Sequence, residues 1–219
     1  MQMEFGYKME QLRIDQEEKK ERIRKVIDEY GGMIPQYEVF YLLSILYPAE
    51  RCLEAFSRYE EIKAYGKPEL VIGIVQEAIG HAAALSRFFW PSEIKKKKAE
   101  RINELMRLRG EKLRTAFHIT EESPLSNRNL RNAWEHFDER LDEYLLENDV
   151  GFFFPGCIKG SCMSVEDSLA RVFKLIDIET NCLILLGQKY FFLPIWNEVR
   201  EIHNSTVGKI GNEYRLSII

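Results

Sequence analysis

The chain has 219 residues, of which 45% are hydrophobic and 30% charged, a composition typical of a soluble globular protein with a hydrophobic core. Its net charge of −4 argues against general coating of nucleic acid but leaves room for a local basic pocket. No apolar run approaches the roughly 20 residues that a membrane span needs. The N-terminus lacks the apolar core and cleavage site of a secretory signal. We therefore expect a cytoplasmic protein with no membrane partner.

The chain contains four cysteines, Cys52, Cys157, Cys162 and Cys182. Cys157 and Cys162 have four residues between them, whereas a CxxC redox pair has two. A zinc site would need two more ligands close by, and the neighbouring sequence offers none. We therefore expect free thiols, which fits a reducing compartment.

Three segments of different character follow one another along the chain. Residues 1–32 are rich in charge and poor in apolar positions, which predicts a peripheral N-terminal helix that ends at Gly31-Gly32. Residues 33–149 form a series of helical patterns, and Pro48 in the first of them either kinks one helix or begins a second. Residues 150–219 begin as a loop and continue with short β-rich runs and a terminal helix.

The most apolar of the helical patterns lies between Glu69 and Pro91, and we expect it to be the central helix. Its apolar residues recur at helical spacing at Val71, Val75, Ala78, Ala82, Leu85 and Phe89. The opposite face carries the small residues Gly73, Gly80 and Ala84, which predicts another helix packed closely against it. The next helix starts near the lysine run at 95–98 and is expected to end at Gly110.

The last segment carries β-rich runs at Arg171–Ile178, Cys182–Leu186 and Tyr190–Leu193, separated by turn residues at Glu179–Asn181 and Gly187. Pro194 then begins a short terminal helix. The predicted fold is mainly α: an antiparallel bundle of four or five helices with a small C-terminal β-hairpin appendix.

The stretch LRNAWEHFDERLDEYL, Leu130 to Leu145, predicts an amphipathic helix whose polar face is unusual. Asn132 and His136 lie about 40° apart on an ideal helix, whereas Arg131 and His136 lie about 140° apart. Three interpretations follow. Arg131 pairs with Glu135 and Asp138 while His136 is simply solvated, or Arg131 curls toward the face of His136, or a second copy supplies the missing group.

The run RNAWEH, Arg131 to His136, resembles the motif of the HEPN superfamily. In that motif a polar residue directly follows an arginine, and a histidine stands four to six residues after the arginine. The longer sequence SRFFWPS…SPLSNRNLRNAWEHFDERLDEY is similar to a group of uncharacterised bacterial proteins associated with the same helical bundle. The resemblance covers about residues 36–148 and does not extend to the N-terminal helix or the β-rich segment.

This resemblance implies a homodimer whose two motif helices face each other and form one composite site. Catalytic members of the superfamily are metal-independent endoribonucleases that need no cofactor, and some are toxins or defence proteins with an antitoxin or other protein partner. Carried over to this chain, His136 would act as the general base or acid on RNA, Arg131 would hold the phosphate, and Asn132 would orient the substrate or His136. Asp138 replaces the tyrosine at which toxin members are modified. The alternative is a non-catalytic interaction module in which these residues form a structural polar network.

Glu77 is the only carboxylate inside the central helix, and His81 follows it at i+4. A buried carboxylate must be paired or protonated. Glu77 and His81 therefore either contact Arg131 or His136 and hold them in position, or make a local structural pair. A metal site built from these two residues and His136 would need another firm ligand, so we expect no metal.

Overall fold

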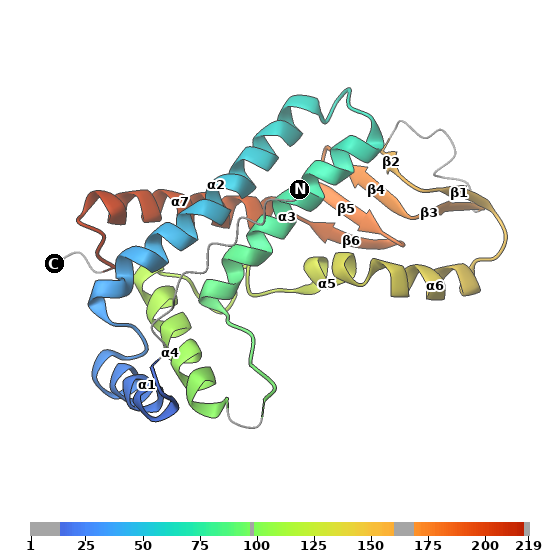
Figure 1. Cartoon of the computed structure of the whole chain (residues 1–219). Helices are drawn as coiled ribbons and strands as arrows, with labels where there is room; N and C mark the ends of the chain where they lie inside the picture. Colours follow the sequence, from blue (N-terminus) through green and yellow to red (C-terminus); the bar gives the residue numbers. More distant parts are fainter. Residues whose placement is uncertain (1–13, 97–98, 160–168, 217–219) are drawn as a thin grey trace, which may run out of the picture.

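The computed structural model describes residues 14–96, 99–159 and 169–216, and within these ranges the fold is mainly helical with a small β region toward the C-terminus (Figure 1). The helices are α1 (Gln16–Tyr30), the 3-10 helix η1 (Pro35–Tyr37), α2 (Glu38–Ile62), α3 (Pro68–Phe89), α4 (Glu100–Phe117), α5 (Asn129–Glu135), α6 (Phe137–Glu147) and α7 (Leu193–Gly211). The strands are β1 (Phe152–Phe154), β2 (Cys157–Ile158), β3 (Ala170–Val172), β4 (Lys174–Asp177), β5 (Cys182–Leu185) and β6 (Gln188–Phe191). The predicted fold class is confirmed at this level.

Helices α2 and α3 lie side by side at the centre of the molecule (Figure 1). The predicted apolar face of α3 is confirmed, because all six of its residues from Val71 to Phe89 are buried. The expectation that a helix covers the small-residue face is wrong, since Gly73, Gly80 and Ala84 are exposed. The reason is that α2 packs on one side of α3 and strands β2 and β4 on another, which leaves the small face to solvent. Helix α2 runs through Pro48 as a single helix.

The β region contains more strands than the predicted hairpin. Strands β2, β4, β5 and β6 form one sheet in that order, parallel at β2–β4 and antiparallel elsewhere, and β1 pairs with β3 in a separate parallel pair. The predicted turns are confirmed, with left-handed backbone at Asn181 (φ 50°) and Gly187 (φ 80°).

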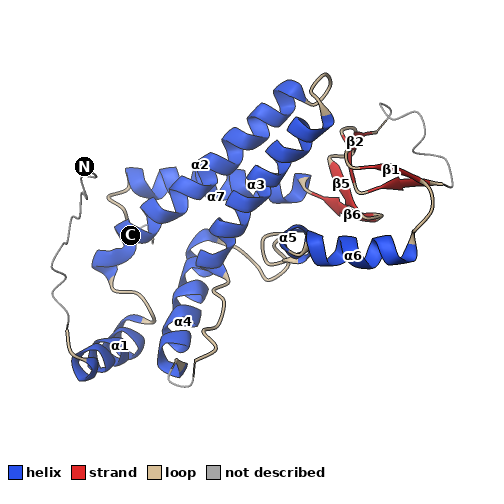
Figure 2. Ribbon diagram, turned by 45° about the vertical axis from the view of Figure 1, so that its right-hand side comes forward, coloured by secondary structure: helices blue, strands red, loops and turns tan. Residues whose placement is uncertain are grey.

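The sheet shares the core of the helices and is not a separate appendix. Ile176 of β4 and Leu183 of β5 are fully buried in the same cluster as the α3 face. The rings of Phe192 and Trp196 stack on Phe56 of α2, with centroids 5.8 and 4.8 Å away. Helix α7 is long, at 19 residues, and packs along α2, so the prediction of a short terminal helix is wrong (Figure 2).

Helix α4 continues past Gly110, where the sequence predicted its end. Gly110 is buried, and a Cβ added there would lie 2.6 Å from the carbonyl oxygen of Phe89 at the end of α3. The glycine therefore permits close contact between two helices and does not terminate one. Arg114, one turn later, donates to the same carbonyl oxygen at 2.5 Å.

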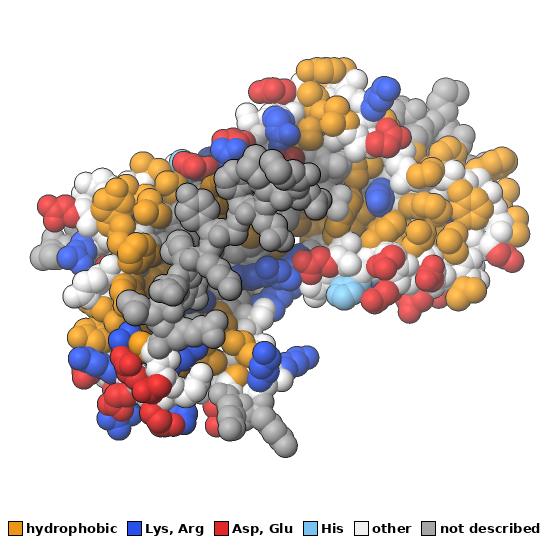
Figure 3. All heavy atoms as spheres, viewed as in Figure 1, with side chains coloured by type: hydrophobic (Ala, Val, Ile, Leu, Met, Phe, Trp, Pro, Cys, Tyr) orange, Lys and Arg blue, Asp and Glu red, His pale blue; other side chains and the backbone are white. Residues whose placement is uncertain are grey.

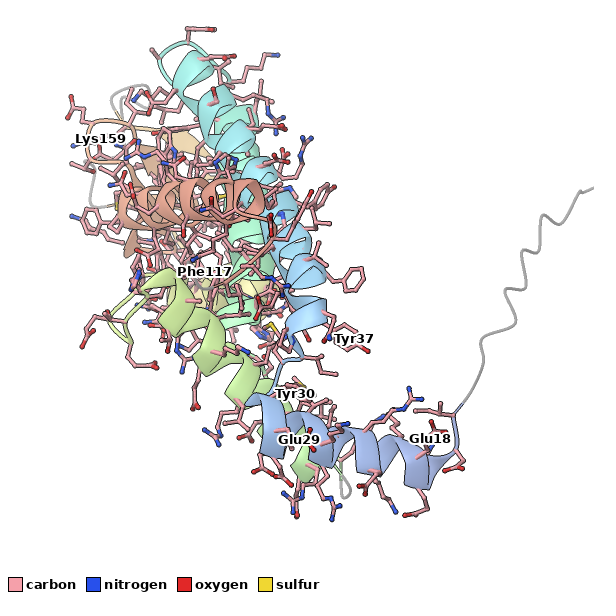
Figure 4. The ribbon with its side chains drawn as sticks, turned by 90° about the vertical axis from the view of Figure 1, so that its left-hand side faces the viewer. Glu18, Glu29, Tyr30, Tyr37, Phe117 and Lys159 are labelled. Atoms are coloured by element: carbon pink, nitrogen blue, oxygen red, sulfur yellow. The ribbon has the colours of Figure 1, made fainter. Side chains whose placement is uncertain are left out.

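Helix α1, which carries Glu18 and Glu29, projects from the body of the molecule (Figure 4). It packs on α4, and Ile27 is its only buried residue. Its predicted end is confirmed, because Gly31 caps it in the left-handed conformation at φ 58°. At the other end of α4, Phe117 lies against α7, where the Lys209 Nζ is 5.3 Å from the centre of its ring.

The prediction of free thiols is correct for two cysteines and wrong for a third. Cys52 and Cys182 are free and buried, and burial raises the pKa of the Cys52 thiol to about 12. Cys157 is disulfide-bonded, and Cys162 lies outside the described residues. Among the described helices, none combines the length and apolar character needed to cross a membrane.

The contact at Gly110 can be tested by adding one methyl group. Gly110→Ala should lower the free energy of unfolding by about 1–3 kcal/mol, because the Cβ would meet the Phe89 carbonyl. Gly80→Ala is the matched control, since nothing lies within 4 Å of a Cβ at that helical position. The control should gain roughly 0.5–1 kcal/mol. Urea denaturation would measure both, and equal effects would contradict the proposed contact.

Candidate functional site

The sequence predicted one continuous helix through the RNAWEH stretch, and this prediction is wrong. Helix α5 ends at Glu135, α6 begins at Phe137, and His136 between them has φ −111° and ψ 32°. Trp134 lies before the break and Phe137 after it, and both rings contact the same cation. The Lys174 Nζ of β4 lies 5.1 Å from the ring centre of Trp134 and 4.4 Å from that of Phe137. The side chains of Asn132 and His136 therefore cannot be placed by ideal helical angles.

Arg131 pairs with Glu135 one turn along α5, as the first of the three interpretations predicted, whereas its predicted pairing with Asp138 is not found among the described ion pairs. The Arg131 Nε lies 2.9 Å from Glu135 Oε1, and the Arg131 side chain is only 18% exposed. Arg87 of α3 approaches the same carboxylate oxygen at 4.0 Å. The hydrogen bond from Arg131 holds the pKa of Glu135 below its usual range, with further help from Arg87. Glu135 therefore stands as an anion between two guanidinium groups.

Arg131 also lines a cavity of about 460 Å³, here called the arginine-lined cavity. Its lining residues come from α3, the segment after it, α4 and α5, and are Arg87, Phe88, Pro91, Ser92, Met106, Arg109 and Arg131. No carboxylate is among them. Lys and Arg side chains gather at the hollow between the end of α3 and the α5–α6 segment, opposite acidic side chains on α6 (Figure 3).

Arg109 is the member of this cavity whose charge is least compensated. Its guanidinium lies 5.5 Å from the centre of the Tyr41 ring and donates to the Arg87 carbonyl oxygen at 3.4 Å. Its Nε is buried without a hydrogen-bond partner, and Arg109 makes no ion pair with any described carboxylate. Glu135 thus pairs with two of the three guanidinium groups, those of Arg131 and Arg87, which leaves the cavity with an excess of positive charge.

The sequence reasoning missed Arg87 and Arg109. They lie 44 and 22 residues before Arg131 in a charge-rich chain, and neither stands in a motif. One available signal was Gly110, because a glycine inside a helix often marks the close approach of another backbone. That signal would have placed the neighbouring Arg109 beside another element without saying which one.

Asn132 and His136 lie on the surface and do not line the arginine-lined cavity. The His136 side chain is 57% exposed, and its Nδ1 is 3.3 Å from Glu139 Oε1. Within one chain, the structure therefore brings Arg131 to the cavity without bringing His136 there. Among the described residues, no group of three or more His, Cys, Asp or Glu side chains is arranged to hold a metal ion.

Glu77 is not buried, so the premise of its predicted role is wrong. Its side chain is 43% exposed and accepts from Arg58 of α2 at 2.5 Å. This hydrogen bond holds the pKa of Glu77 below its usual range, and half-buried His81 adds a smaller electrostatic contribution. Glu77 therefore contacts Arg58 across the α2–α3 pair, and the structure does not bring it to Arg131 or His136.

Comparison with known proteins yields no significant match to any protein-family model, curated protein or solved structure.

The Glu77–Arg58 pair should make a small, pH-dependent contribution to the free energy of unfolding. Glu77→Gln should lower the free energy of unfolding at pH 7 by less than about 1 kcal/mol, because both side chains are close to half exposed. Since the carboxyl pKa is lowered by folding, its contribution is present above the unfolded pKa and is lost as pH falls through the folded pKa. Denaturation curves of the two proteins should therefore converge in acid. A difference that persists in acid would contradict this assignment.

Proposed function

We propose that this protein is an HEPN-like, metal-independent endoribonuclease that acts as a homodimer and binds the RNA backbone in the arginine-lined cavity. The observation that carries the proposal is the convergence of Arg87, Arg109 and Arg131, from three different helices, on a cavity with no carboxylate in its lining. Arg131 is also the arginine of the motif-like stretch.

Phosphate is the ligand that this arrangement favours. Guanidinium groups present several N–H donors in a planar fork that matches the oxygens of a phosphate. Three such groups repel one another, and Glu135 compensates only part of that charge. A bound phosphate would relieve the repulsion and give the Arg109 guanidinium the ion-pair partner that it lacks among the described carboxylates.

The exposed position of His136 fits a composite site. In a dimer with facing motif helices, His136 of one copy would reach RNA held by Arg131 of the other. His136 would take the proton of a ribose 2′-hydroxyl as its oxygen attacks the phosphorus atom. The bond to the 5′ oxygen then breaks, and that oxygen takes up a proton. The products are a 2′,3′-cyclic phosphate and a 5′-hydroxyl, and Arg131 stabilises the charge on the phosphoryl oxygens.

Cleavage of RNA in EDTA is the direct test. Wild-type protein should cut single-stranded or transfer RNA without added metal, and His136→Ala should reduce the rate by about 10²–10⁴-fold through loss of the general base or acid. Thermal stability should stay nearly unchanged, because the His136 ring is 57% exposed. His203→Ala on α7 is the matched control. Undiminished cleavage by His136→Ala would rule out this mechanism.

A mixing experiment distinguishes a composite site from one contained in each chain. Arg131→Ala and His136→Ala proteins should each be inactive alone. If the two residues act across a dimer, co-expressed heterodimers regain one complete site and recover part of the wild-type activity. Heterodimers that stay inactive would show that Arg131 and His136 do not act together across the interface.

Glu135 should compete with the phosphate for the arginines. Glu135→Gln removes its negative charge while keeping its size, so Arg131 and Arg87 become available to the ligand. We expect the variant to bind single-stranded RNA several-fold more tightly than wild type, measured by fluorescence anisotropy at fixed salt. Glu139→Gln, beside His136, is the matched control. Weaker binding by Glu135→Gln would mean that Glu135 orients the arginines.

The second candidate is a non-catalytic interaction module, and the Arg131–Glu135 pair within one chain favours it. In that case the polar residues are structural, and Arg131→Ala should lower stability or break a dimer. Calorimetry and light scattering on Arg131→Ala would distinguish the two candidates. A stable, intact dimer that has lost RNA binding supports the nuclease proposal and contradicts the module.

A further inference from the structure

A second cavity of about 520 Å³ adjoins the arginine-lined cavity, and the two share Pro91, Ser92 and Met106 as lining residues. We call it the Trp90 cavity, because Trp90 at the end of α3 stands in its wall. Its volume lies within the range of pockets for small organic ligands, roughly 300–1,000 Å³. The two cavities therefore lie next to each other.

The two cavities differ in charge. The Trp90 cavity is lined by three arginines, Arg107, Arg114 and Arg128, and also by three carboxylates, Glu93, Glu104 and Glu111. The arginines are already engaged: Arg107 with Glu111 at 2.5 Å, and Arg114 with Glu121 at 3.0 Å. Arg128 donates to the Trp90 carbonyl oxygen at 2.8 Å. Because the positive and negative charges in its lining balance, the Trp90 cavity suits an uncharged polar group, whereas the arginine-lined cavity suits an anion.

The Trp90 ring contacts two charged side chains, Glu121 and Arg114. Its Nε1 donates to Glu121 at 3.0 Å, and the Arg114 guanidinium lies 5.5 Å from its ring centre. Glu121 thus accepts from Trp90 and forms an ion pair with Arg114. The ring remains only half-buried. Aromatic and guanidinium planes are the surfaces on which proteins stack unpaired nucleobases.

We propose that the Trp90 cavity is a nucleobase subsite and that the ligand of this protein is single-stranded RNA. One phosphate lies in the arginine-lined cavity, and the base of an adjacent nucleotide enters the Trp90 cavity. A duplex is excluded, because its bases are paired and stacked inside the helix and cannot enter a side cavity. The inference rests on the proposed function, since it takes the arginine-lined cavity as the phosphate site.

Binding of paired oligonucleotides tests the subsite. Three probes with identical backbones are compared by fluorescence anisotropy: a single strand, the same strand without bases, and a duplex. All carry 2′-O-methyl riboses, so that cleavage cannot occur. Wild-type protein should bind the single strand roughly 5- to 150-fold more tightly than the abasic strand, the range expected for stacking of one base. The duplex should bind more weakly than the single strand.

Variants assign the difference to its residues. Trp90→Leu should lose the preference for bases and keep its affinity for the abasic strand, whereas Trp90→Phe should retain much of the preference. Arg109→Gln should weaken binding of both strands equally. If Trp90→Leu does not fold, the wild-type comparison of the three probes remains decisive.

Each result separates the subsite from the phosphate site. Equal binding of the single and abasic strands by wild type overturns the nucleobase subsite and leaves the phosphate site standing. Tighter binding of the duplex overturns the single-strand preference. Failure to bind any of the probes overturns the proposed function together with this inference.

Discussion

Close contact between the end of α3 and the middle of α4 is the constraint on which both cavities depend. The Phe89 carbonyl oxygen occupies the space where a side chain at position 110 would begin, and Arg114 donates to the same oxygen. This contact sets Arg109 beside the Arg87 carbonyl. Ile94, which follows α3, is also held, because the Asn103 side chain bonds both its N–H and its carbonyl oxygen. The walls of the cavities thus rest on backbone contacts.

The distribution of charge matters more than its total. The chain has a net charge of −4, yet three arginines converge on a cavity without a carboxylate in its lining. Glu135 reduces their repulsion, and the exposed acidic residues of α6 lie nearby, outside the cavity (Figure 3). An anionic polymer is attracted to the arginines and repelled by α6, so the favourable path for a backbone is narrow. The net charge alone does not reveal this local positive cavity.

The C-terminal segment supports the position of α3. Stacking of Phe192 and Trp196 on Phe56 fastens β6 and α7 to α2, and strands β2 and β4 pack against α3 from the other side. The Tyr59 hydroxyl donates to the Asn181 side chain in the β4–β5 turn, at 3.1 Å. Helix α3 is therefore held between α2, which precedes it in the chain, and strands that lie far from it in sequence. Its last turn can carry Arg87 in a stable position.

The sequence by itself determined what depends on neighbouring residues. Periodicity identified the buried face of α3, and turn residues identified the ends of α1, β4 and β5, because helical spacing and left-handed backbone are local properties. Only the tertiary structure decided the rest. Gly110 permits close contact between α3 and α4 because the Phe89 carbonyl lies opposite it. Glu77 pairs with Arg58 because α2 lies beside α3. The helix breaks at His136, next to the two rings that contact Lys174. The resemblance pointed to Arg131, but Arg87 and Arg109 join it through contacts between helices that no local pattern encodes.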